Sequence, residues 1–285
     1  MKTKNLFIAS LMTIALFISC DSTDKTSDAT VANPTEQVAV DAKIDASIDD
    51  VSNIVEDQFS MKQSGTSKSS EKIKSMLPAC AIVTWSLTNG TFTGTIDFGT
   101  EGCALENGNV LKGKITLTFS SNFDTAEQSI TYTFDGFYHN GKKLQGSKTI
   151  TRSLKSTELL ATVHPVITCT VDMTLTFEDE KVYKRTGNRV KEMVEGYDTK
   201  GSWDDNVFLV TGSGTTTMPN GDVCTSTIQT PLRYVMACKK PFPVSGTILK
   251  VKNGTETLVD FGNGECDNLA AITVAGVTTS IELKK

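Results

Sequence analysis

Histidine, tryptophan and proline are scarce in this chain: its 285 residues include 2 His, 2 Trp and 7 Pro. Two histidines leave few side chains for a zinc site or for acid–base catalysis, because imidazole is the commonest group in both. The net charge of −5 and the isoelectric point near 5.2 argue against nucleic acid as a partner. Phosphate binding needs a basic face, and none is expected here.

Familiar catalytic motifs are also absent from the sequence. It contains no Gly-x-Ser-x-Gly, no His-Glu-x-x-His, no phosphate-binding loop and no dinucleotide fingerprint. No Cys-x-x-Cys and no neighbouring pair of histidines indicates a redox or zinc site. We therefore expect no catalytic residue, no metal site and no cofactor.

A long apolar run occurs at the N-terminus and not later in the chain. Leu6–Ser19 holds 14 residues behind Lys2 and Lys4. At about 1.5 Å per residue it reaches roughly 21 Å, which is shorter than a hydrocarbon core of about 30 Å. A short apolar run behind a positive start is typical of a signal peptide, which we predict over residues 1–19.

A cysteine follows the end of this run. Ser19-Cys20 resembles a bacterial lipobox, in which a small residue precedes a cysteine that is lipidated and begins the mature chain. The resemblance implies a membrane anchor of several acyl chains on Cys20, each buried CH₂ contributing roughly 0.8 kcal/mol. Residues 20–35 are mainly Asp, Ser, Thr, Ala and Asn without apolar periodicity, which predicts a disordered tether.

An amphipathic helix is predicted over residues 36–60. Apolar residues recur there every three or four positions and form one stripe: Val40, Ile44, Ile48, Val51, Val55 and Phe59. Acidic residues fill the other face: Asp41, Asp45, Asp49, Asp50, Glu56 and Asp57. The stripe could pack on the chain's own domain or bind a partner. Residues 61–75, which are rich in Ser and Lys, predict a flexible linker.

From residue 76 to residue 285 the helical period gives way to period-two patterns. The 41 threonines of the chain suit half-exposed strands. Asn-Gly pairs beginning at Asn89, Asn140, Asn220 and Asn253 predict tight turns. The predicted strands are Ile82–Leu87, Thr91–Asp97, Lys114–Phe119, Ser129–Phe134, Gln145–Arg152, Val166–Phe177, Lys181–Lys191, Asn206–Gly212, Cys224–Thr230, Val244–Val251, Thr255–Phe261, Ala271–Val274 and Thr278–Leu283. We predict an all-β domain whose antiparallel sheet forms a sandwich, an open barrel or a twisted meander.

Six cysteines remain besides Cys20, an even number that predicts disulfides in an exported chain. An internal repeat favours one set of pairings. Asp-Phe-Gly beginning at Asp97 precedes Cys103 by the same spacing as Asp-Phe-Gly beginning at Asp260 precedes Cys266, and each copy has an upstream cysteine. The predicted bonds are Cys80–Cys103, Cys238–Cys266 and, by remainder, Cys169–Cys224.

Few other residues stand out for their chemistry. His139 and His164 are expected at the surface or at strand ends and not in catalysis, and Trp85 is expected in the core. The segment Trp203-Asp204-Asp205-Asn206 places an aromatic ring beside two carboxylates. Such a loop can hold Ca²⁺ or a sugar hydroxyl, but a solvated turn is the simpler interpretation.

The C-terminal segment Gly262-Asn263-Gly264-Glu265-Cys266-Asp267-Asn268 resembles a motif of an uncharacterised family of Bacteroidota lipoproteins. Those proteins are similar in having a lipobox, an acidic helical N-terminal region and a β domain. The resemblance implies export, lipid anchoring and a place in a Gram-negative envelope, with the outer membrane as the expected location. It implies no activity.

Three functions stay open at this point. The first is a non-enzymatic lipoprotein whose β domain is structural, adhesive or ligand-binding, with a glycan or an envelope protein as its partner. The second is a glycan-directed hydrolase, which needs two carboxylates facing one cleft. The third is a carrier of hydrophobic molecules, which needs an open apolar groove.

Overall fold

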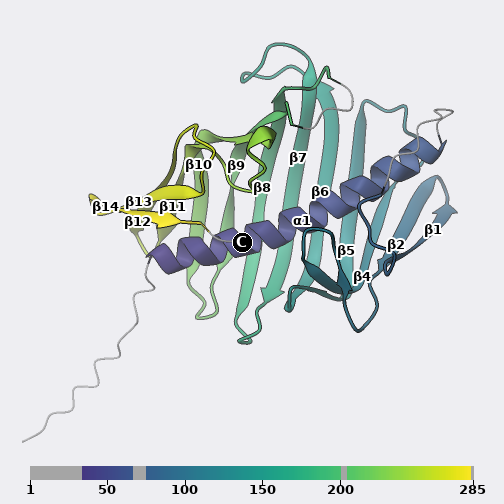
Figure 1. Ribbon diagram of the computed structural model, residues 1–285, viewed down its shortest axis with the longest axis horizontal. Coiled ribbons are helices and arrows are strands. Elements are labelled where there is room, and N and C mark those ends of the chain that lie inside the picture. Colours follow the sequence, from purple (N-terminus) through teal and green to yellow (C-terminus); the bar gives the residue numbers. More distant parts are fainter. Residues whose placement is uncertain (1–33, 67–74, 200–203, 284–285) are drawn as a thin grey trace, which may run out of the picture. The chain divides into compact units, whose positions relative to one another are not determined.

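The computed structural model describes residues 34–66, 75–199 and 204–283, which form one α-helix and fourteen strands (Figure 1). The helix α1 is Pro34–Thr66, and a single 3₁₀ turn covers Met236–Cys238. The strands are β1 Ile82–Thr88, β2 Thr91–Asp97, β3 Cys103–Ala104, β4 Val110–Ser120, β5 Glu127–His139, β6 Lys142–Lys155, β7 His164–Thr176, β8 Val182–Glu195, β9 Val207–Thr217, β10 Val223–Val235, β11 Ser245–Lys252, β12 Thr255–Asn263, β13 Leu269–Val274 and β14 Val277–Glu282. The predicted signal peptide, Cys20 and Trp203 lie outside the described residues.

The strands form one antiparallel sheet in which almost every strand pairs with its neighbour in the chain. The order runs from β1 through β2 and β4 to β14, and the short β3 pairs only with β4. β1 and β14 are therefore the edges of a single open meander. Of the three architectures left open by the sequence, the meander is the one that this order describes.

Tight turns at the predicted Asn-Gly pairs join several of these strands. Asn89, Asn140 and Asn253 have φ of 49°, 48° and 49°, and the glycine after each is also left-handed. Consecutive positive φ angles are the signature of the two-residue hairpin turn that matches the twist of paired strands. All thirteen predicted strands are present, and the two-residue β3 was not predicted.

The helix lies across one face of this sheet (Figure 1). Five residues of the predicted stripe, Ile44, Ile48, Val51, Val55 and Phe59, are buried in one cluster with sheet residues such as Ile115 and Leu117. Near the start of α1, Val38 joins a second cluster with Val259 and Phe261. The stripe therefore packs on the chain's own sheet, which decides between its two predicted roles.

The helix continues to Thr66, six residues into the predicted linker. Lys62 accounts for part of this extension, because its ammonium group lies 4.6 Å from the ring centre of Phe92 and 5.3 Å from that of Trp85. A lysine over an aromatic face gains both from its apolar stem and from cation–π attraction. Trp85 is partly buried there and packs against the core as expected. Within the described ranges, no helix combines the length and the apolar character that a membrane crossing requires.

Two of the three predicted disulfides are present. Cys80–Cys103 closes the β1–β2 hairpin and Cys238–Cys266 closes the β11–β12 hairpin, with Cα–Cα distances of 5.8 and 5.2 Å. The repeat extends to local structure, since Asp97 accepts a hydrogen bond from the Gly99 amide and Asp260 one from Gly262, both at 2.9 Å. These two hairpins are equivalent units near opposite edges of the sheet.

The third predicted disulfide is wrong, because Cys169 and Cys224 are free thiols. They lie on β7 and β10, three strand spacings apart in the sheet. Three spacings amount to about 14 Å, whereas a disulfide needs Cα atoms within about 7 Å. Burial raises the pKa of both thiols, which keeps them protonated and unreactive.

Candidate functional site

Most acidic residues of α1 are at least partly buried, although they lie outside the apolar stripe. The helix carries seven acidic and two basic residues. The sheet face that packs against it is called the helix face below. Five of its cations form ion pairs with carboxylates of α1: Lys148, Arg152, Arg185, Arg189 and Lys250. The carboxylates turn toward the sheet because these cations compensate their burial.

Asp41 is at the centre of the most buried part of this network. Lys250 donates to its Oδ2, and Thr216 donates to its Oδ1 at 2.9 Å. Arg185 lies 3.5 Å from the same Oδ1 and donates to the Thr216 hydroxyl at 2.6 Å. The side chains of all three charged residues are at most 8% exposed. Each polar atom therefore exchanges water for a protein partner, as burial demands.

One turn further along α1, Asp45 bridges two arginines. Arg185 lies 3.0 Å and Arg189 lies 2.6 Å from its carboxylate. Burial alone would raise the pKa of Asp45, but the two guanidinium groups outweigh it and hold the pKa far below its ordinary value. Asp45 is thus a fixed anion that orients Arg189, one of the residues beside the groove described below.

A serine–lysine pair lies beneath the helix. Lys148 donates to the Ser52 hydroxyl at 2.7 Å, and that hydroxyl lies 3.0 Å from Tyr132. The arrangement resembles the pair that some hydrolases use, but all three side chains are buried between helix and sheet. Burial would lower the pKa of Lys148, yet its neighbours raise it above the ordinary value, so it stays an ammonium ion and cannot act as a base.

His139 is buried and hydrogen-bonded to Asp50 on α1, at 2.9 Å. Asn107 and Asn109 donate to the same carboxylate at 2.8 and 2.9 Å. Burial would raise the pKa of Asp50, but these three donors lower it below its ordinary value. The expectation that His139 lies at a strand end is confirmed, because β5 ends there, and the alternative of a surface position is wrong.

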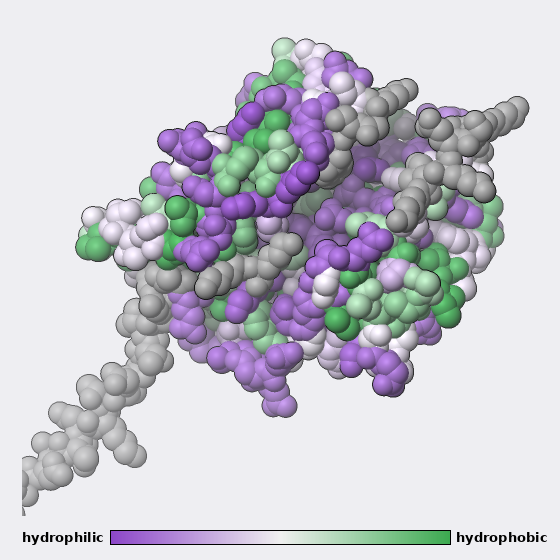
Figure 2. Space-filling model, in the orientation of Figure 1, coloured by the Kyte–Doolittle hydropathy of each residue, from purple (hydrophilic) through white to green (hydrophobic). Residues whose placement is uncertain are grey.

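A groove of about 750 Å³ opens over the outward side of α1. Figure 2 shows the molecule hollowed near the middle of the view, with mainly hydrophilic atoms inside the hollow. The helix contributes the small residues Ala42 and Ala46, whose size leaves this space open, together with Asp49 and Asn53. The groove is thus bordered by the same helix whose other sides are bonded to the sheet.

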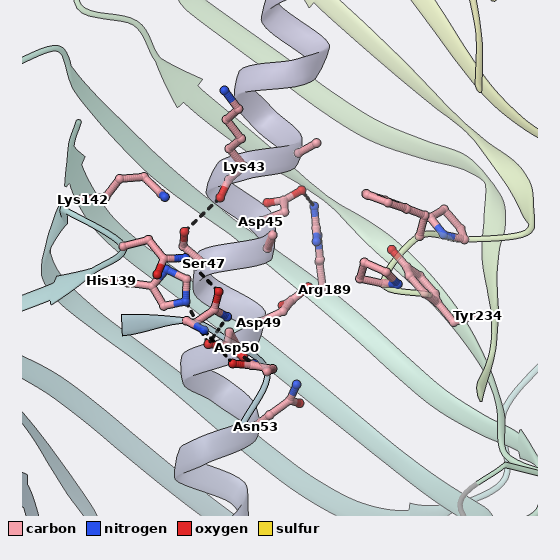
Figure 3. Close-up of a pocket in the computed structure, with 18 of the residues that line it drawn as sticks. Lys43, Asp45, Ser47, Asp49, Asp50, Asn53, His139, Lys142, Arg189 and Tyr234 are labelled. Atoms are coloured by element: carbon pink, nitrogen blue, oxygen red, sulfur yellow. Dashed lines mark hydrogen bonds and ion pairs between the residues drawn. The ribbon is translucent and has the colours of Figure 1, made fainter. Parts of the chain in front are cut away.

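The two sides of the groove differ in chemistry. On one side the turns between strands bring the ring of Phe177 and mainly polar groups: Asn107, Asn109, His139, Asn140, Lys142, Glu178 and Asp179. On the other side lie mainly aromatic and aliphatic groups: Leu232, Tyr234, Pro241, Phe242, Pro243, Ile248 and Phe261. Figure 3 shows this division across the helix, with His139 and Lys142 on one side of α1 and Arg189 and Tyr234 on the other.

The second histidine, His164, is fully buried away from the groove and not on the surface. Its Nδ1 lies 2.7 Å from the Thr162 carbonyl and its Nε2 lies 2.9 Å from the Glu192 carboxylate. Glu192 also accepts a bond from Thr157 at 2.5 Å. Both ring nitrogens therefore lie against acceptors, and the contacts of Glu192 with His164 and Thr157 tie the β6–β7 connection to β8.

The acidic segment singled out in the sequence lies outside the groove. Asp204 and Asp205 are in a turn and are exposed. Asp204 lies 3.7 Å from Lys239, while Asp205 accepts a bond from Thr199 at 2.5 Å. The two carboxylates therefore serve different partners. Within the described residues, no group of three or more His, Cys, Asp or Glu side chains is placed to hold a metal ion.

The sequence singles out His139, Asn140 and the acidic residues of α1, but it does not predict that they border one groove. Lys43, Lys142, Arg189 and Tyr234 come from α1, β6, β8 and β10 and belong to no motif. One signal was present: Arg185 and Arg189 occupy the same alternate positions of β8 as the buried Tyr183, which places cations on an inward face. A search of family models, curated proteins and solved structures found no match to this chain.

Proposed function

We propose that this protein is a non-enzymatic lipoprotein of the outer membrane that binds a carbohydrate in the groove over α1. The observation that carries the proposal is the division of one groove into a hydrogen-bonding side and an aromatic side. A sugar ring has hydroxyl groups around its edge and C–H groups on its faces. The hydroxyls suit charged and amide side chains, and the C–H faces suit aromatic rings.

The state of two of the groove's carboxylates, Asp45 and Asp50, supports binding over hydrolysis. A glycosidase needs one carboxyl as an acid and another as a base or nucleophile. Asp45 is held by two arginines and Asp50 by His139 and two asparagines. Their lowered pKa values keep both ionised, so neither is suited to donate a proton.

The position of α1 supports a polar ligand over a hydrophobic one. A carrier would need an open apolar surface on the sheet, but the apolar residues of the helix face are covered by Ile44, Val51, Phe59 and their neighbours. What stays open beside α1 has a polar side. We therefore favour carbohydrate binding over the transport of hydrophobic molecules.

A glycan array tests this function directly. The full-length protein in detergent should bind one class of polysaccharide and release no reducing ends from it. Phe242→Ala should weaken binding, because Phe242 borders the groove. Tyr138→Ala is the matched control, since Tyr138 lies on the sheet face opposite α1. Equal binding by both variants, or turnover of the bound glycan, would contradict the proposal.

The lipid anchor is tested separately. The sequence Ser19-Cys20 at the end of the apolar run supports lipidation of Cys20. Cys20→Ala should leave unprocessed or soluble protein, whereas the native chain should fractionate with the outer membrane and carry acyl chains by mass spectrometry. Normal acylation of the variant would contradict this assignment.

A further inference from the structure

The strand β1 forms an open edge of the sheet. It pairs with β2 on one side, and no described strand pairs with it on the other. Its seven residues pair with β2 without a register shift, and none of them is charged or a proline. Charges, prolines and bulges are the usual features that keep an edge strand from pairing with another chain. β1 has none of these, whereas β14 at the opposite edge ends in Glu282.

The backbone N–H and C=O groups of alternate residues in β1 point out of the sheet. A two-residue turn joins Thr88 to Thr91, and the pair that closes such a hairpin is hydrogen-bonded. The bonding direction alternates along a strand, so the even-numbered residues of β1 bond to β2. Ser121 donates to the Gly90 carbonyl at 2.8 Å, which agrees, because it shows that even-numbered positions in this stretch bond toward β4. The residues whose backbone groups point out of the sheet are Val83, Trp85 and Leu87.

The ring of Trp85 lies away from this edge. A Cβ atom at Gly94 on β2 would clash with that ring, so the ring lies across β2. There it contacts Phe92 and Phe119, with 6.4 and 5.6 Å between the ring centres. A glycine in the middle of a strand often marks such a close approach. The largest side chain of β1 therefore leaves the backbone groups at the edge open to another strand.

A second copy of β1 fits this edge in one antiparallel register. When the pair is centred on Trp85, this residue lies opposite its counterpart, and Val83 lies opposite Leu87 of the second copy. Each such pair can exchange two N–H···O=C hydrogen bonds, so every outward-pointing residue of β1 is used. A shift by two residues would need Ala81, whose amide already bonds to a carbonyl three residues earlier, or Asn89, which lies in the turn.

The side chains suit the same register. Val83 and Leu87 are on the helix face, because both pair with buried residues of β2. Their contact across the two copies would cover Leu87, which is 57% exposed in one copy. On the outer face Thr84 would lie opposite Ser86 of the second copy, and no like charges would meet along the strand pair.

We propose that the protein forms a homodimer in which β1 pairs with β1 of a second copy in this register. The inference is independent of the proposed carbohydrate function. The two-fold axis of such a pair is perpendicular to the sheet, so the two helices lie on the same face of one continuous sheet. Pairing of identical edges closes after two copies, whereas pairing of β1 with β14 would continue into a filament. The groove occurs twice on one face of this dimer, an arrangement that raises the avidity for a ligand with repeated units.

Cysteines across the dimer axis test the register. Thr84 and Ser86 of different copies would form a non-hydrogen-bonded pair with Cα atoms about 4.5 Å apart, which a disulfide can bridge. Full-length Thr84→Cys and Ser86→Cys proteins in detergent, mixed and mildly oxidised, should form a covalent heterodimer on a non-reducing gel. Each variant oxidised alone should form at least about tenfold less, because equal positions lie diagonally about 7–8 Å apart. Equal cross-linking of mixed and separate samples, or no cross-linking, overturns the proposal.

Edge variants show whether β1 makes the contact. Leu87→Pro removes an N–H group that points out of the sheet and keeps the bonds to β2, so thermal unfolding should change little. In the cysteine mixture it should reduce cross-linking at least about tenfold. Thr278→Pro is the matched control and should leave cross-linking intact, because by the same alternation its N–H group points out of the opposite edge.

A second change at the same position covers the case in which Leu87→Pro does not fold. Leu87→Lys keeps the backbone and places a charge beside Val83 of the second copy, so it should also reduce cross-linking. Cross-linking that survives Leu87→Lys, or that Thr278→Pro removes, overturns the proposal.

Discussion

The two faces of the sheet carry different kinds of polar side chain. Five Lys and Arg side chains of the helix face each meet a carboxylate of α1. The outer face, whose residues alternate with those of the helix face, is built mainly from hydroxyl groups. Alternation along a strand therefore separates inside from outside here, but it does not separate charged from uncharged residues.

Hydroxyl side chains make up most of two rows across the outer face. Strand pairing places side chains from β1 to β10 side by side in one such row: Thr84, Thr95, Thr116, Thr133, Ser147, Asp172, Thr186, Thr215 and Thr225. The next row is similar: Ser86, Thr93, Thr118, Thr131, Thr149, Thr170, Asn188, Ser213 and Thr227. Threonine suits these positions because its methyl group covers the pleated sheet and its hydroxyl reaches water.

The difference between the faces reflects the cost of burying charge. A buried cation under α1 is stable only if a carboxylate lies next to it. The helix and the sheet must therefore both contribute charged residues to their contact. On the outer face water and neighbouring hydroxyl groups supply the hydrogen bonds, as between Thr131 and Thr149, so most side chains there need no charge. We infer that the ion pairs set the position of α1 on the sheet, whereas the outer rows leave stability almost unaffected.

The largest expected effect follows from removing a cation beneath the helix. Arg185→Met leaves Asp41 and Asp45 buried with fewer partners, and breaking such a pair typically costs about 3–5 kcal/mol. Lys184→Met is the control, because Lys184 is the adjacent residue and its ion pair with Asp172 is more than half exposed on both sides. We expect that control to lose at most about 1 kcal/mol in urea unfolding. Equal losses would show that the two faces do not differ.

If Arg185→Met does not fold, a second change keeps the test open. Asp45→Asn added to Arg185→Met removes one of the two anions that lost a partner and should restore part of the lost stability. Restoration identifies the incompletely compensated charge as the cause. If the double variant is no more stable than Arg185→Met, the loss comes from the packing of the arginine stem instead.

A smaller effect is expected from acid. The folded pKa of Asp45 lies below its ordinary value of 3.8, so folding favours the ionised form. This stabilisation is fully present above pH 3.8 and is lost as the pH falls through the lower folded value. The urea concentration at the unfolding midpoint of the native protein should therefore decrease as the pH is lowered below about 4. Asp45→Asn should make the midpoint less dependent on pH in this range. Asp97→Asn, at an exposed pair on the outer face, should flatten this dependence far less, because the pKa of Asp97 is also lowered but water screens its charge.

The strands were predictable from the sequence because their signals are local. Period-two alternation and Asn-Gly turns depend on neighbouring residues, and so do the spacings that predicted Cys80–Cys103 and Cys238–Cys266. The last disulfide was assigned by remainder, with no local signal of its own. It is also the prediction that strand order contradicts, since Cys169 and Cys224 are three strands apart.

The inward position of His139 was not predictable from alternation alone. Ile130 and Tyr132 of β5 face the helix. Simple alternation would keep the even-numbered residues of β5 inward and would turn His139 outward. The pairing of β5 with β6 shifts between Thr133 and Tyr138, and Gly136 in this stretch has a φ of 54°. This bulge moves the inward positions to Phe137 and His139.

The ion pairs could not be predicted because their partners are far apart in the chain. Asp41 and Lys250 are separated by 209 residues, and Asp50 and His139 by 89. The sequence indicates an acidic helix and a few cations at inward positions of the strands. Which cation meets which carboxylate depends on where α1 crosses the sheet, and so does the groove beside it.

The smallest expected effects compare one substitution on adjacent residues of β9. Thr216 is fully buried on the helix face, where it accepts a bond from Arg185 and donates one to Asp41. Thr216→Val keeps the shape but leaves both partners one bond short, which should cost about 1–3 kcal/mol. Thr215 lies in an outer row, where valine only replaces a hydroxyl that water can reach. Thr215→Val should therefore stay within about 0.5 kcal/mol of the native protein. Both residues are threonines on β9 and both change to valine, so a difference between the two urea midpoints measures the contrast between the faces. Equal midpoints would show that the faces do not differ in this respect.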